Sequence, residues 1–432
     1  GLCVRACRDV QVNDVLGMSG RGAESYPVFD MNNPMGESSC VGCGECVQAC
    51  PTGALIETSL LDKNNDQTIF PDKKIKSLCP FCGVGCQTLV SVKDNKIVSV
   101  NGENGPANEN RLCVKGRFGF DYINSPERLT TPLIRISQKT KSWDISIDNQ
   151  DIYKYFRKAS WEEALDFASN RFTKILKSNN KNSLAGFGSA KGSNEEAYIF
   201  QKLIRTGFKT NNVDHCTRLC HASSVAALLE SVGSAAVSAP FTTVKDSECI
   251  ILIGARPEQN HPVAASYFKQ AVKNGTKLII LDPRKQSLSR YATHHLQFNP
   301  GQDLALLNAM IFTIIDENLI NKEYIENHTE GFKQLEKEIK KFDPALMEKL
   351  CGIPKEIIRE VAKIYAKAKT SIIFWGMGIS QHIHGTQNAF SLINLSLITG
   401  HLGKSGTGLH PLRGQNNVQG ASDAGLIPMS FP

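Results

Sequence analysis

The hydrophobic pattern of the chain changes near residue 160. Beyond this point, short apolar runs alternate with amphipathic stretches, and the runs predict buried strands over 184–188, 249–254, 277–282 and 372–375. The amphipathic stretches predict helices over about 160–177, 193–207, 262–273 and from residue 303 onward. Ser160 with Glu163, and Ser193 with Glu196, have capping-box spacing, which supports two of these helix starts. Alternating apolar strands and helices are typical of doubly wound parallel α/β sheets, the fold class that we expect.

The N-terminal part of the chain has a different pattern. Residues 1–58 are rich in cysteine and glycine and can hardly bury a core of their own. Residues 59–77 are polar and charged and predict a linker. Two short strands around a turn are predicted over 89–92 and 96–100. Residues 131–160 carry only weak loop and strand signals.

Composition narrows the class of protein. The 432 residues are 41% hydrophobic and 21% charged, with a net charge of +7, as in ordinary globular proteins. No apolar run approaches the roughly 18 residues that span a membrane, and the scattered basic residues argue against a nucleic-acid partner. Fourteen cysteines in so long a chain favour metal binding in a reducing compartment over a disulfide framework. Because Gly1 opens inside a cysteine motif and Pro432 follows no closing element, we expect a piece of a longer chain.

Four cysteines and a proline have the spacing of a bacterial ferredoxin, in the run Cys40, Cys43, Cys46, Cys50 and Pro51. In such a run three cysteines bind one cubane and the fourth binds its neighbour. The pair Cys3 and Cys7 fits the last two positions of a second run. The spacing therefore predicts one 4Fe-4S cluster on Cys40, Cys43, Cys46 and Cys7, and another on Cys3, Cys50 and two cysteines upstream of Gly1. A zinc knot is the alternative.

A further set of cysteines predicts a third cluster, on Cys79, Cys82, Cys86 and Cys113. The first three are closely spaced, and the fourth is followed directly by Val114, Lys115 and Gly116, a combination that makes zinc the weaker alternative. Three cubanes in series would carry single electrons. They imply a nearby site that produces or consumes electrons in pairs.

Three segments resemble the molybdopterin oxidoreductases. Residues 79–86 and 111–116 resemble their cluster module, and 218–225 (Arg-Leu-Cys-His-Ala-Ser-Ser-Val) resembles their metal-ligand motif in its formate dehydrogenase version. Residues 411–420 resemble the substrate-arginine loop of the same enzymes, and 1–58 resembles the ferredoxin module of cytoplasmic formate dehydrogenase alpha subunits. The resemblance covers essentially the whole chain.

The resemblance implies reversible oxidation of formate to carbon dioxide. It implies molybdenum or tungsten held by two molybdopterin guanine dinucleotides, three 4Fe-4S clusters, one of them incomplete here, and an electron-transfer partner that is flavin- or NAD-linked or a ferredoxin. The implied domains are a truncated two-cluster ferredoxin-like module with its linker (1–72), the cluster domain of the family (73–130), the first half of an α/β molybdopterin domain (131–215), an α/β dinucleotide-cofactor domain (216–415) and the start of a truncated return segment (416–432).

The same resemblance suggests the reacting residues. Cys220 would be the metal ligand, because a thiolate suits a soft, sulfur-bound metal, with Cys216 as a weaker competitor. His221 would handle the proton, since histidine titrates near neutrality. Arg413 would bind the formate carboxylate as a bidentate fork. Lys115 would bridge the third cluster and a pterin, with charge compensation of the cluster as the alternative.

Residues that follow strands are candidates for holding the cofactor. An acid there can bind a ribose or guanine, and a glycine can admit a pyrophosphate, although either is commonly just part of a turn. The candidates are Lys115, Gly254, Asp282, Arg284, Gly301, Asp303, Gly376, Met377, Gln381 and Gln415. We expect His382 and His384 to be ordinary helix-start residues, and Cys249 and Cys351 to be plain core or surface residues.

Two other functions compete with formate oxidation. One is a molybdopterin oxidoreductase that acts on a different small anion. The other is a metal-free scaffold, like the large iron–sulfur subunit of respiratory complex I, that only carries electrons. Cys220, His221 and Arg413 favour an enzyme, because a scaffold needs none of them.

Overall fold

A five-stranded parallel sheet forms the centre of the larger part of the molecule. The computed structural model describes residues 1–136, 152–178 and 181–432, so 137–151, part of the stretch expected as loop and strand, lie outside the described residues. The strand order is β12-β11-β10-β13-β14, and all pairings are parallel. The strands are β10 (Cys249–Ile253), β11 (Lys277–Leu281), β12 (His294–Leu296), β13 (Ser371–Trp375) and β14 (Gly408–Pro411). The predicted α/β class and three of the predicted strands are confirmed.

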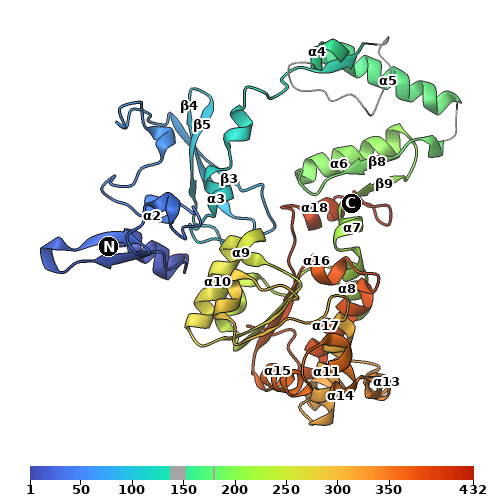
Figure 1. Cartoon of the computed structure of the whole chain (residues 1–432). Helices are drawn as coiled ribbons and strands as arrows, with labels where there is room; N and C mark the ends of the chain where they lie inside the picture. Colours follow the sequence, from blue (N-terminus) through green and yellow to red (C-terminus); the bar gives the residue numbers. More distant parts are fainter. Residues whose placement is uncertain (137–151, 179–180) are drawn as a thin grey trace.

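Alternate side chains of these strands point to opposite faces of the sheet, and both faces are buried. Ile251 and Ile253 belong to one core with helices, whereas Ile250 and Leu252 belong to a second core that includes the cysteines of the third set. The first face is covered by α8 (Ala222–Val232), α11 (Asp303–Asp316), α14 (Pro344–Cys351), α15 (Lys355–Lys367) and α17 (Gly385–Thr399), and the second by α10 (Pro262–Lys273) (Figure 1). Each fully buried isoleucine contributes roughly 1.5–3 kcal/mol of hydrophobic stabilisation. Burial on both faces explains why the strands read as continuous apolar runs.

The order of the strands reverses beside β10. From β10 the chain proceeds outward to β11 and β12, then returns to β13 on the other side and ends at β14. The carboxyl ends of β10 and β13 are therefore neighbours with connections that leave in opposite directions. In open α/β sheets, ligands bind in the crevice at such a switch point.

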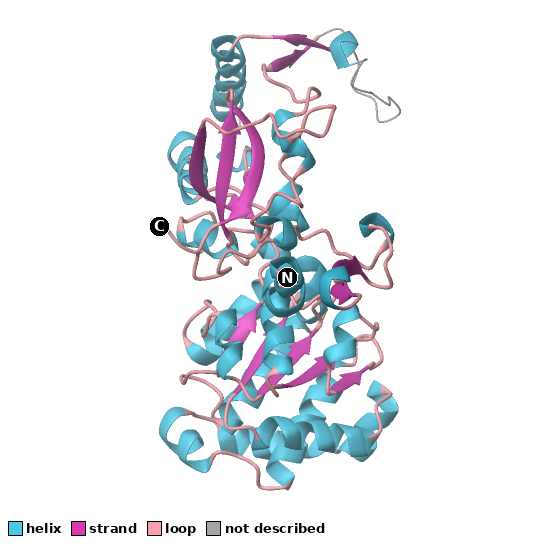
Figure 2. Ribbon diagram, turned by 90° about the vertical axis from the view of Figure 1, so that its left-hand side faces the viewer, coloured by secondary structure: helices cyan, strands magenta, loops and turns pink. Residues whose placement is uncertain are grey.

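Two cysteine-bearing modules precede this sheet. The first contains α1 (Leu2–Arg5), the π-helix η1 (Ala6–Val10), the antiparallel pair β1 (Leu16–Ser19) and β2 (Tyr26–Phe29), and α2 (Glu45–Gln48). The second contains the antiparallel sheet β3 (Lys73–Leu78), β4 (Gln87–Lys93) and β5 (Lys96–Gly102), seen apart from the larger sheet in Figure 2, and α3 (Val114–Phe118). The predicted hairpin is confirmed. The linker prediction is wrong over 73–77, because these residues form the exposed edge strand β3, where lysines discourage pairing with other chains.

A smaller unit forms around a two-stranded parallel sheet, β8 (Gly186–Gly188) with β9 (Val213–His215). Before it come β6 (Leu133–Arg135), α4 (Ile152–Tyr155), β7 (Phe156–Lys158) and α5 (Trp161–Ser178), and between its strands lie α6 (Asn194–Lys202) and η7 (Leu203–Gly207). Both predicted capping serines accept a hydrogen bond at their helix starts, at 3.1 Å for Ser160 and 3.2 Å for Ser193. The C-terminal α18 (Val418–Asp423) returns to this unit, where Ala421 and Leu426 join its core.

The remaining helices are short connectors. They are α7 (Thr217–Cys220), α9 (Pro257–Asn260), α12 (Lys322–His328), α13 (Phe332–Glu338) and α16 (Met377–Ser380). Cys249 and Cys351 are fully buried core residues, in agreement with the prediction. Among the described residues, we find no helix with the length and apolar character needed to cross a membrane.

Candidate active site

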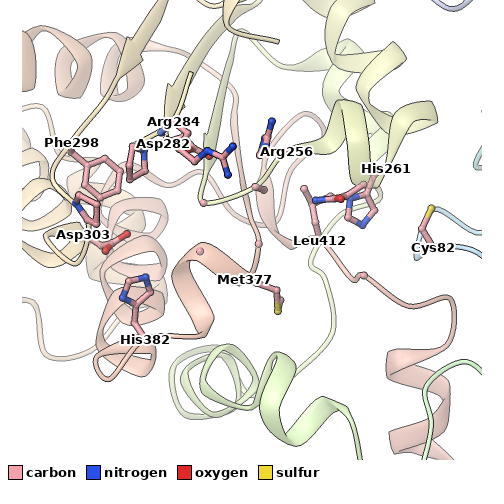
Figure 3. A pocket seen from close by; sticks show the side chains of 18 of the residues that line it. Cys82, Arg256, His261, Asp282, Arg284, Phe298, Asp303, Met377, His382 and Leu412 are labelled. Carbon is pink, nitrogen blue, oxygen red and sulfur yellow. Dashed lines mark hydrogen bonds between the residues drawn. The ribbon is translucent and has the colours of Figure 1, made fainter. Parts of the chain in front are cut away.

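A cavity of about 510 Å³ lies at the carboxyl ends of the five-stranded sheet, where the strand order reverses (Figure 3). Residues that follow every strand of the sheet contribute to its lining: Gly254 after β10, Asp282 after β11, Gly301 after β12, Gly376 after β13 and Gly414 after β14. Because parallel strands all end at one edge, residues far apart in sequence meet here.

Most of the candidate cofactor residues line this one cavity. The eight that do so are Lys115, Gly254, Asp282, Arg284, Gly301, Asp303, Gly376 and Met377. Gln381 and Gln415 are outside the lining. Gln381 Nε2 donates a hydrogen bond to the carbonyl of Leu219, at 2.8 Å, and so holds the residue before Cys220. Gln415 lines a second cavity beside Arg413.

Gly254 is required by close backbone packing. Its φ is +57°, and a Cβ there would lie 2.9 Å from the backbone of Gly378. A Cβ on Gly378 would in turn lie 2.6 Å from the Cα of Gly254. The loop after β10 and the start of α16 therefore pack backbone to backbone, and a side chain at either position would force them apart.

The cavity has acidic groups at the ends of β11 and β12. Asp282 is buried, and its Oδ1 accepts a hydrogen bond from the backbone N–H of Arg284 at 2.8 Å. Burial raises the pKa of Asp303, an effect that nearby His382 partly offsets. His384 is at the N-cap position of α17, as expected, but His382 lines the cavity and faces Asp303 (Figure 3).

Sequence reasoning missed two residues of the cavity. Arg256 has a buried Nε that finds no hydrogen-bond partner in the part of the chain that the structure describes. His261 is buried, and its Nε2 lies 2.6 Å from the carbonyl oxygen of Arg413, which only an N–H can satisfy. The unpartnered Nδ1 of His261 is therefore a free acceptor. The sequence did contain a signal for Arg256, because it lies two residues after Gly254, which was a candidate cofactor-binding residue.

Cys220 ends the short helix α7 and is half-buried. Its Sγ lies 3.3 Å from Met377 Sδ and 4.0 Å from Gln415 Oε1. Burial and neighbouring Cys216 raise the pKa of Cys220, while Arg413 lowers it. The competitor Cys216 directs its Sγ to the backbone N–H of Ala190, at 3.4 Å. Cys220 is thus the thiol nearer the large cavity.

Arg413 lines the second cavity, of about 470 Å³, together with Gln415 and His261. Its Nη2 donates to the carbonyl of Ala235 at 2.9 Å, whereas Nε and Nη1 are buried and have no hydrogen-bond partner among the described residues. Burial lowers the pKa of Arg413 to about 10, so the guanidinium stays charged at neutral pH. Two nitrogens of a charged guanidinium are therefore available to donate to an anion.

His221 is fully buried at the end of a hydrogen-bond chain. The indole N–H of Trp375 donates to Ser224 Oγ (2.8 Å), which contacts Ser380 Oγ (2.6 Å), which contacts His221 Nδ1 (3.3 Å). His221 Nε2 then donates to the carbonyl of Leu412 at 3.1 Å. Burial, helped by Arg413, lowers the pKa of His221 to about 3. The ring is therefore neutral at pH 7, which differs from the titration near neutrality that the motif predicted.

The third cysteine set borders the main cavity. Cys82 and Lys115 both line it, and Lys115 Nζ donates to the carbonyl of Gln259 at 3.4 Å. Cys79, Cys82, Cys86 and Cys113 are all buried and interact electrostatically with one another. Burial raises the pKa of Cys79 to about 11, so these thiolates need a compensating cation. Iron would supply that charge.

The N-terminal cysteines lie close together, and Cys3 and Cys40 pack against the core that contains Cys7 and Cys46. Cys43 and Cys46 interact electrostatically with Cys7, and Cys46 also with Cys40. Cys3 and Cys50 instead line a separate cavity of about 340 Å³. Among the described residues, no three His, Cys, Asp or Glu side chains have the close spacing that a single ion needs. A cubane binds one thiolate on each of four irons, so this criterion does not apply to it.

Comparison with known proteins identifies three segments. Residues 128–430 match the family described as molybdopterin oxidoreductase, 72–125 match the molybdopterin oxidoreductase Fe4S4 domain, and 1–54 match the 4Fe-4S dicluster domain. The chain is 40% identical, over 83% of its length and 50% of the relative's, to the F420-dependent formate dehydrogenase subunit alpha of Methanocaldococcus jannaschii. It is 34% identical to a putative formate dehydrogenase of Staphylococcus aureus, over 99% of this chain and 46% of that one. The chain thus spans about half the length of the curated relatives that it matches.

A solved structure shares the fold. Acetylene hydratase from Pelobacter acetylenicus superposes with a TM-score of 0.66 at 24% identity, over 76% of this chain and 43% of that chain. The likeness supports the arrangement of the α/β units around the sheet. Since the family match covers residues 128–430, well over half of the chain, this protein belongs to the molybdopterin oxidoreductase family.

Proposed function

We propose that the whole protein oxidises formate to carbon dioxide, releasing one proton and two electrons, with the reverse reaction at the same site. The single observation that carries this proposal is the proximity of Cys220 to Arg413, whose charge lowers the pKa of Cys220 and whose Nε and Nη1 are buried with no partner among the described residues. The names of its relatives support the choice of formate. A pure electron-transfer scaffold would have no use for this pair.

The main cavity fits a metal held by pterin guanine dinucleotides. The unpartnered Nε of Arg256 and the side chain of Arg284 offer positive charge to a pyrophosphate. The buried carboxylate of Asp303 suits the N–H groups of a guanine at the far end. Lys115 also lines the cavity, and Cys82 lies on the side opposite Asp303, where a pterin would approach the third cluster (Figure 3). When bound, such a centre, with molybdenum or tungsten, accepts the electron pair.

The residues of this chain would orient the substrate and hold the metal ligand. Arg413 would bind the formate carboxylate through the free N–H groups of its guanidinium, aiming the C–H bond away from it. Cys220 would bind the metal, with Leu219 held by Gln381. Neutral His221 donates to the carbonyl of Leu412 and so fixes the strand end that carries Arg413. In this arrangement His221 positions the loop that carries Arg413. For His221 also to transfer a proton, its ring would have to exchange its hydrogen bond to Ser380 or Leu412 for one to another group.

Electrons would leave through the cysteine sets. Lys115 contacts both the main cavity and the surroundings of Cys79 and Cys82, which supports its proposed bridging role. From there the path would lead to the cluster of Cys7, Cys40, Cys43 and Cys46, then to the cluster that includes Cys3 and Cys50, and finally to a flavin-linked or ferredoxin-like partner. Thiolate-bound clusters fit a reducing, cytoplasmic setting.

The test is formate-dependent reduction of a viologen dye by the whole, anaerobically purified, metal-loaded protein. We expect reduction that disappears in Cys220→Ala and persists in the matched control Cys216→Ala, because only Cys220 adjoins Met377 at the cavity. Retained activity in Cys220→Ala would reject Cys220 as the ligand. A metal-containing protein that leaves the dye oxidised in the presence of formate would reject formate as the substrate.

A further inference from the structure

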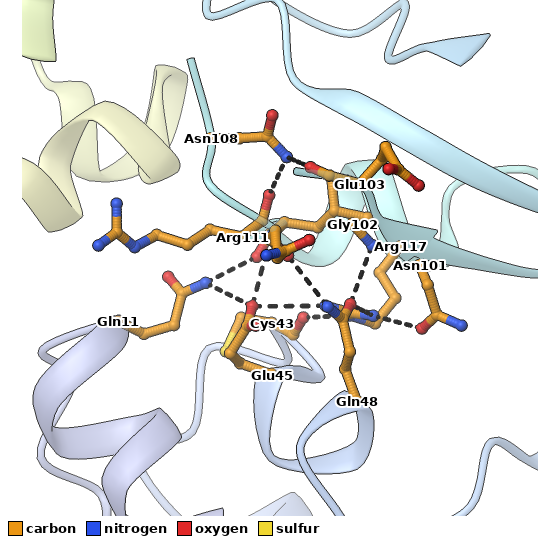
Figure 4. A network of polar contacts seen from close by, with 12 residues as sticks. Gln11, Cys43, Glu45, Gln48, Asn101, Gly102, Glu103, Asn108, Arg111 and Arg117 are labelled. Atoms are coloured by element: carbon orange, nitrogen blue, oxygen red, sulfur yellow. Dashed lines mark hydrogen bonds and ion pairs between the residues drawn. The ribbon is translucent and has the colours of Figure 1, made fainter. Parts of the chain in front are cut away.

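A buried arginine joins the two cysteine-bearing modules (Figure 4). Arg117 belongs to α3 and has a fully buried side chain, 0% exposed. Its backbone N–H donates to the carbonyl of Cys113 at 3.0 Å, so it lies one helical turn beyond the last cysteine of the third set. An arginine is almost never fully buried unless its charge is paired. Its partners therefore show what the residue does.

The guanidinium reaches into the N-terminal module. Nε donates to the carbonyl of Cys43 at 2.7 Å, Nη1 to Gln48 Oε1 at 2.9 Å, and Nη2 lies 3.4 Å from the carboxylate of Glu45. Nη1 also donates to Asn101 Oδ1 of the second module, at 3.0 Å. One side chain thus connects the loop of Cys43 to the helix that follows Cys113.

The N-terminal partners make return contacts with the second module. Glu45 Oε2 accepts from the backbone N–H of Leu112 (3.4 Å) and from Gln11 Nε2 (3.0 Å), which also donates to the carbonyl of Leu112. Gln48 Oε1 accepts from the backbone N–H of Gly102 at 2.9 Å. The backbone of Leu112, directly before Cys113, is therefore held by the N-terminal module.

The arginine packs closely against the backbone of the N-terminal module at Gly44. Gly44 has a φ of +68°, and a Cβ there would lie 2.2 Å from Arg117 Cδ. The glycine between Cys43 and Glu45 is therefore the residue that lets the arginine pass. The guanidinium has no unpartnered nitrogen, in contrast to Arg413. Its full set of bonds identifies a structural fork and not a ligand site.

We propose that Arg117 is a positioning residue that fixes the distance between the cluster of Cys79, Cys82, Cys86 and Cys113 and that of Cys7, Cys40, Cys43 and Cys46, and so sets the rate of electron transfer between them. The inference rests on the proposed function only in assuming that both sets bind clusters. Electron tunnelling falls exponentially with distance, so a small shift of one module would slow it. A lysine keeps the charge but lacks the planar fork, and so cannot hold Cys43, Glu45 and Gln48 together.

The test uses the whole, cluster-loaded protein with Arg117→Lys, and Arg128→Lys at an exposed arginine of the same module as the matched control. In Arg117→Lys we expect unchanged iron content and a weakened spin–spin interaction between the two clusters in the electron paramagnetic resonance spectrum of the dithionite-reduced protein. After rapid mixing with formate, the third cluster should be reduced at the normal rate. The N-terminal cluster should be reduced more slowly than in the wild-type protein, because electron tunnelling falls exponentially with distance.

A second variant guards against misfolding of the first. Gln48→Leu leaves Arg117 and Glu45 paired and removes only the contacts of the amide, so it should weaken the spin–spin interaction in the same direction but less. Unchanged interaction and unchanged reduction of the N-terminal cluster in both variants would overturn the proposal. If formate fails to reduce even the wild-type protein, the proposed function fails. The dithionite spectra would still decide the role of Arg117.

Discussion

Replacing Arg413 with methionine removes the two free donors of the second cavity. The thioether fills much of the same space, so the change mainly deletes the charge and the fork. In the native side chain, one N–H of Nη2 donates to the carbonyl of Ala235, whereas Nε and Nη1 have no hydrogen-bond partner among the described residues. The loss of binding should therefore be that of two charge-assisted hydrogen bonds.

The magnitude follows from these two contacts. A hydrogen bond to a charged group contributes about 1.5–3 kcal/mol, so two contribute roughly 3–6 kcal/mol. This corresponds to a fall in kcat/KM for formate of about 10²- to 10⁴-fold. Arg413→Lys should lose less, because an ammonium keeps the charge while giving up the second donor of the fork.

The assay is steady-state viologen reduction at varied formate concentration, with cluster and metal content measured for each variant. Arg359→Met is the matched control, since Arg359 pairs with Asp316 and Glu317 and lines none of the cavities described above. We expect the control to keep its kcat/KM. An Arg413→Met protein with full metal content and a kcat/KM within about threefold of wild type would refute the reasoning, because that is below the contribution of even one such hydrogen bond.

Three further predictions test the core, the cluster ligands and pH dependence. Ile251→Ala, at a fully buried position of β10, should lower the free energy of unfolding by about 2–5 kcal/mol in urea titrations, whereas exposed Leu346→Ala should change it by less than about 0.5. Cys79→Ala should lose one cluster's iron by metal analysis, whereas Cys351→Ala, in the helical core, should keep it; equal iron in both would contradict the assignment. Burial lowers the pKa of His401 from 6.5 to about 4. Between these two values the imidazole is therefore protonated in the unfolded chain and neutral in the folded chain. The free energy of unfolding should fall by about 2 kcal/mol from this group between pH 7 and pH 5, and His401→Gln should reduce the fall by that amount.

Local spacing was sufficient to predict the main strands and the capped helices. The apolar run at 249–253 has no polar residue to face water, so burial on both faces was its only stable outcome. The ferredoxin spacing assigns Cys3 and Cys50 to one cluster, a prediction that agrees with the position of both residues beside one cavity. Signals of this kind lie within a few residues and need no knowledge of the fold.

Other features depend on partners distant in sequence. Strands β12 and β14 are short and contain histidine or proline, and only pairing along the sheet edge makes them strands. Arg256 and His261 become part of the cavity because the loop after β10 turns toward Arg413, more than 150 residues away. The burial that lowers the pKa of His221 depends in the same way on residues distant in sequence. The sequence shows its neighbour Cys220 but not Ser380 and Leu412, which enclose the ring.

The proximity of cluster and cavity is a consequence of how the sheet is packed. The strands that end at the cavity also supply Ile250 and Leu252 to the core that buries Cys79, Cys82 and Leu112. The third cysteine set is therefore held by apolar contacts to the same strands whose carboxyl ends border the cavity, so that Cys82 lines it. Leu112 in turn is bonded to Gln11 and Glu45 of the N-terminal module. A single continuous set of packed and hydrogen-bonded groups thus connects the cavity to the N-terminal module and its cysteines, and the proposed electron path follows it.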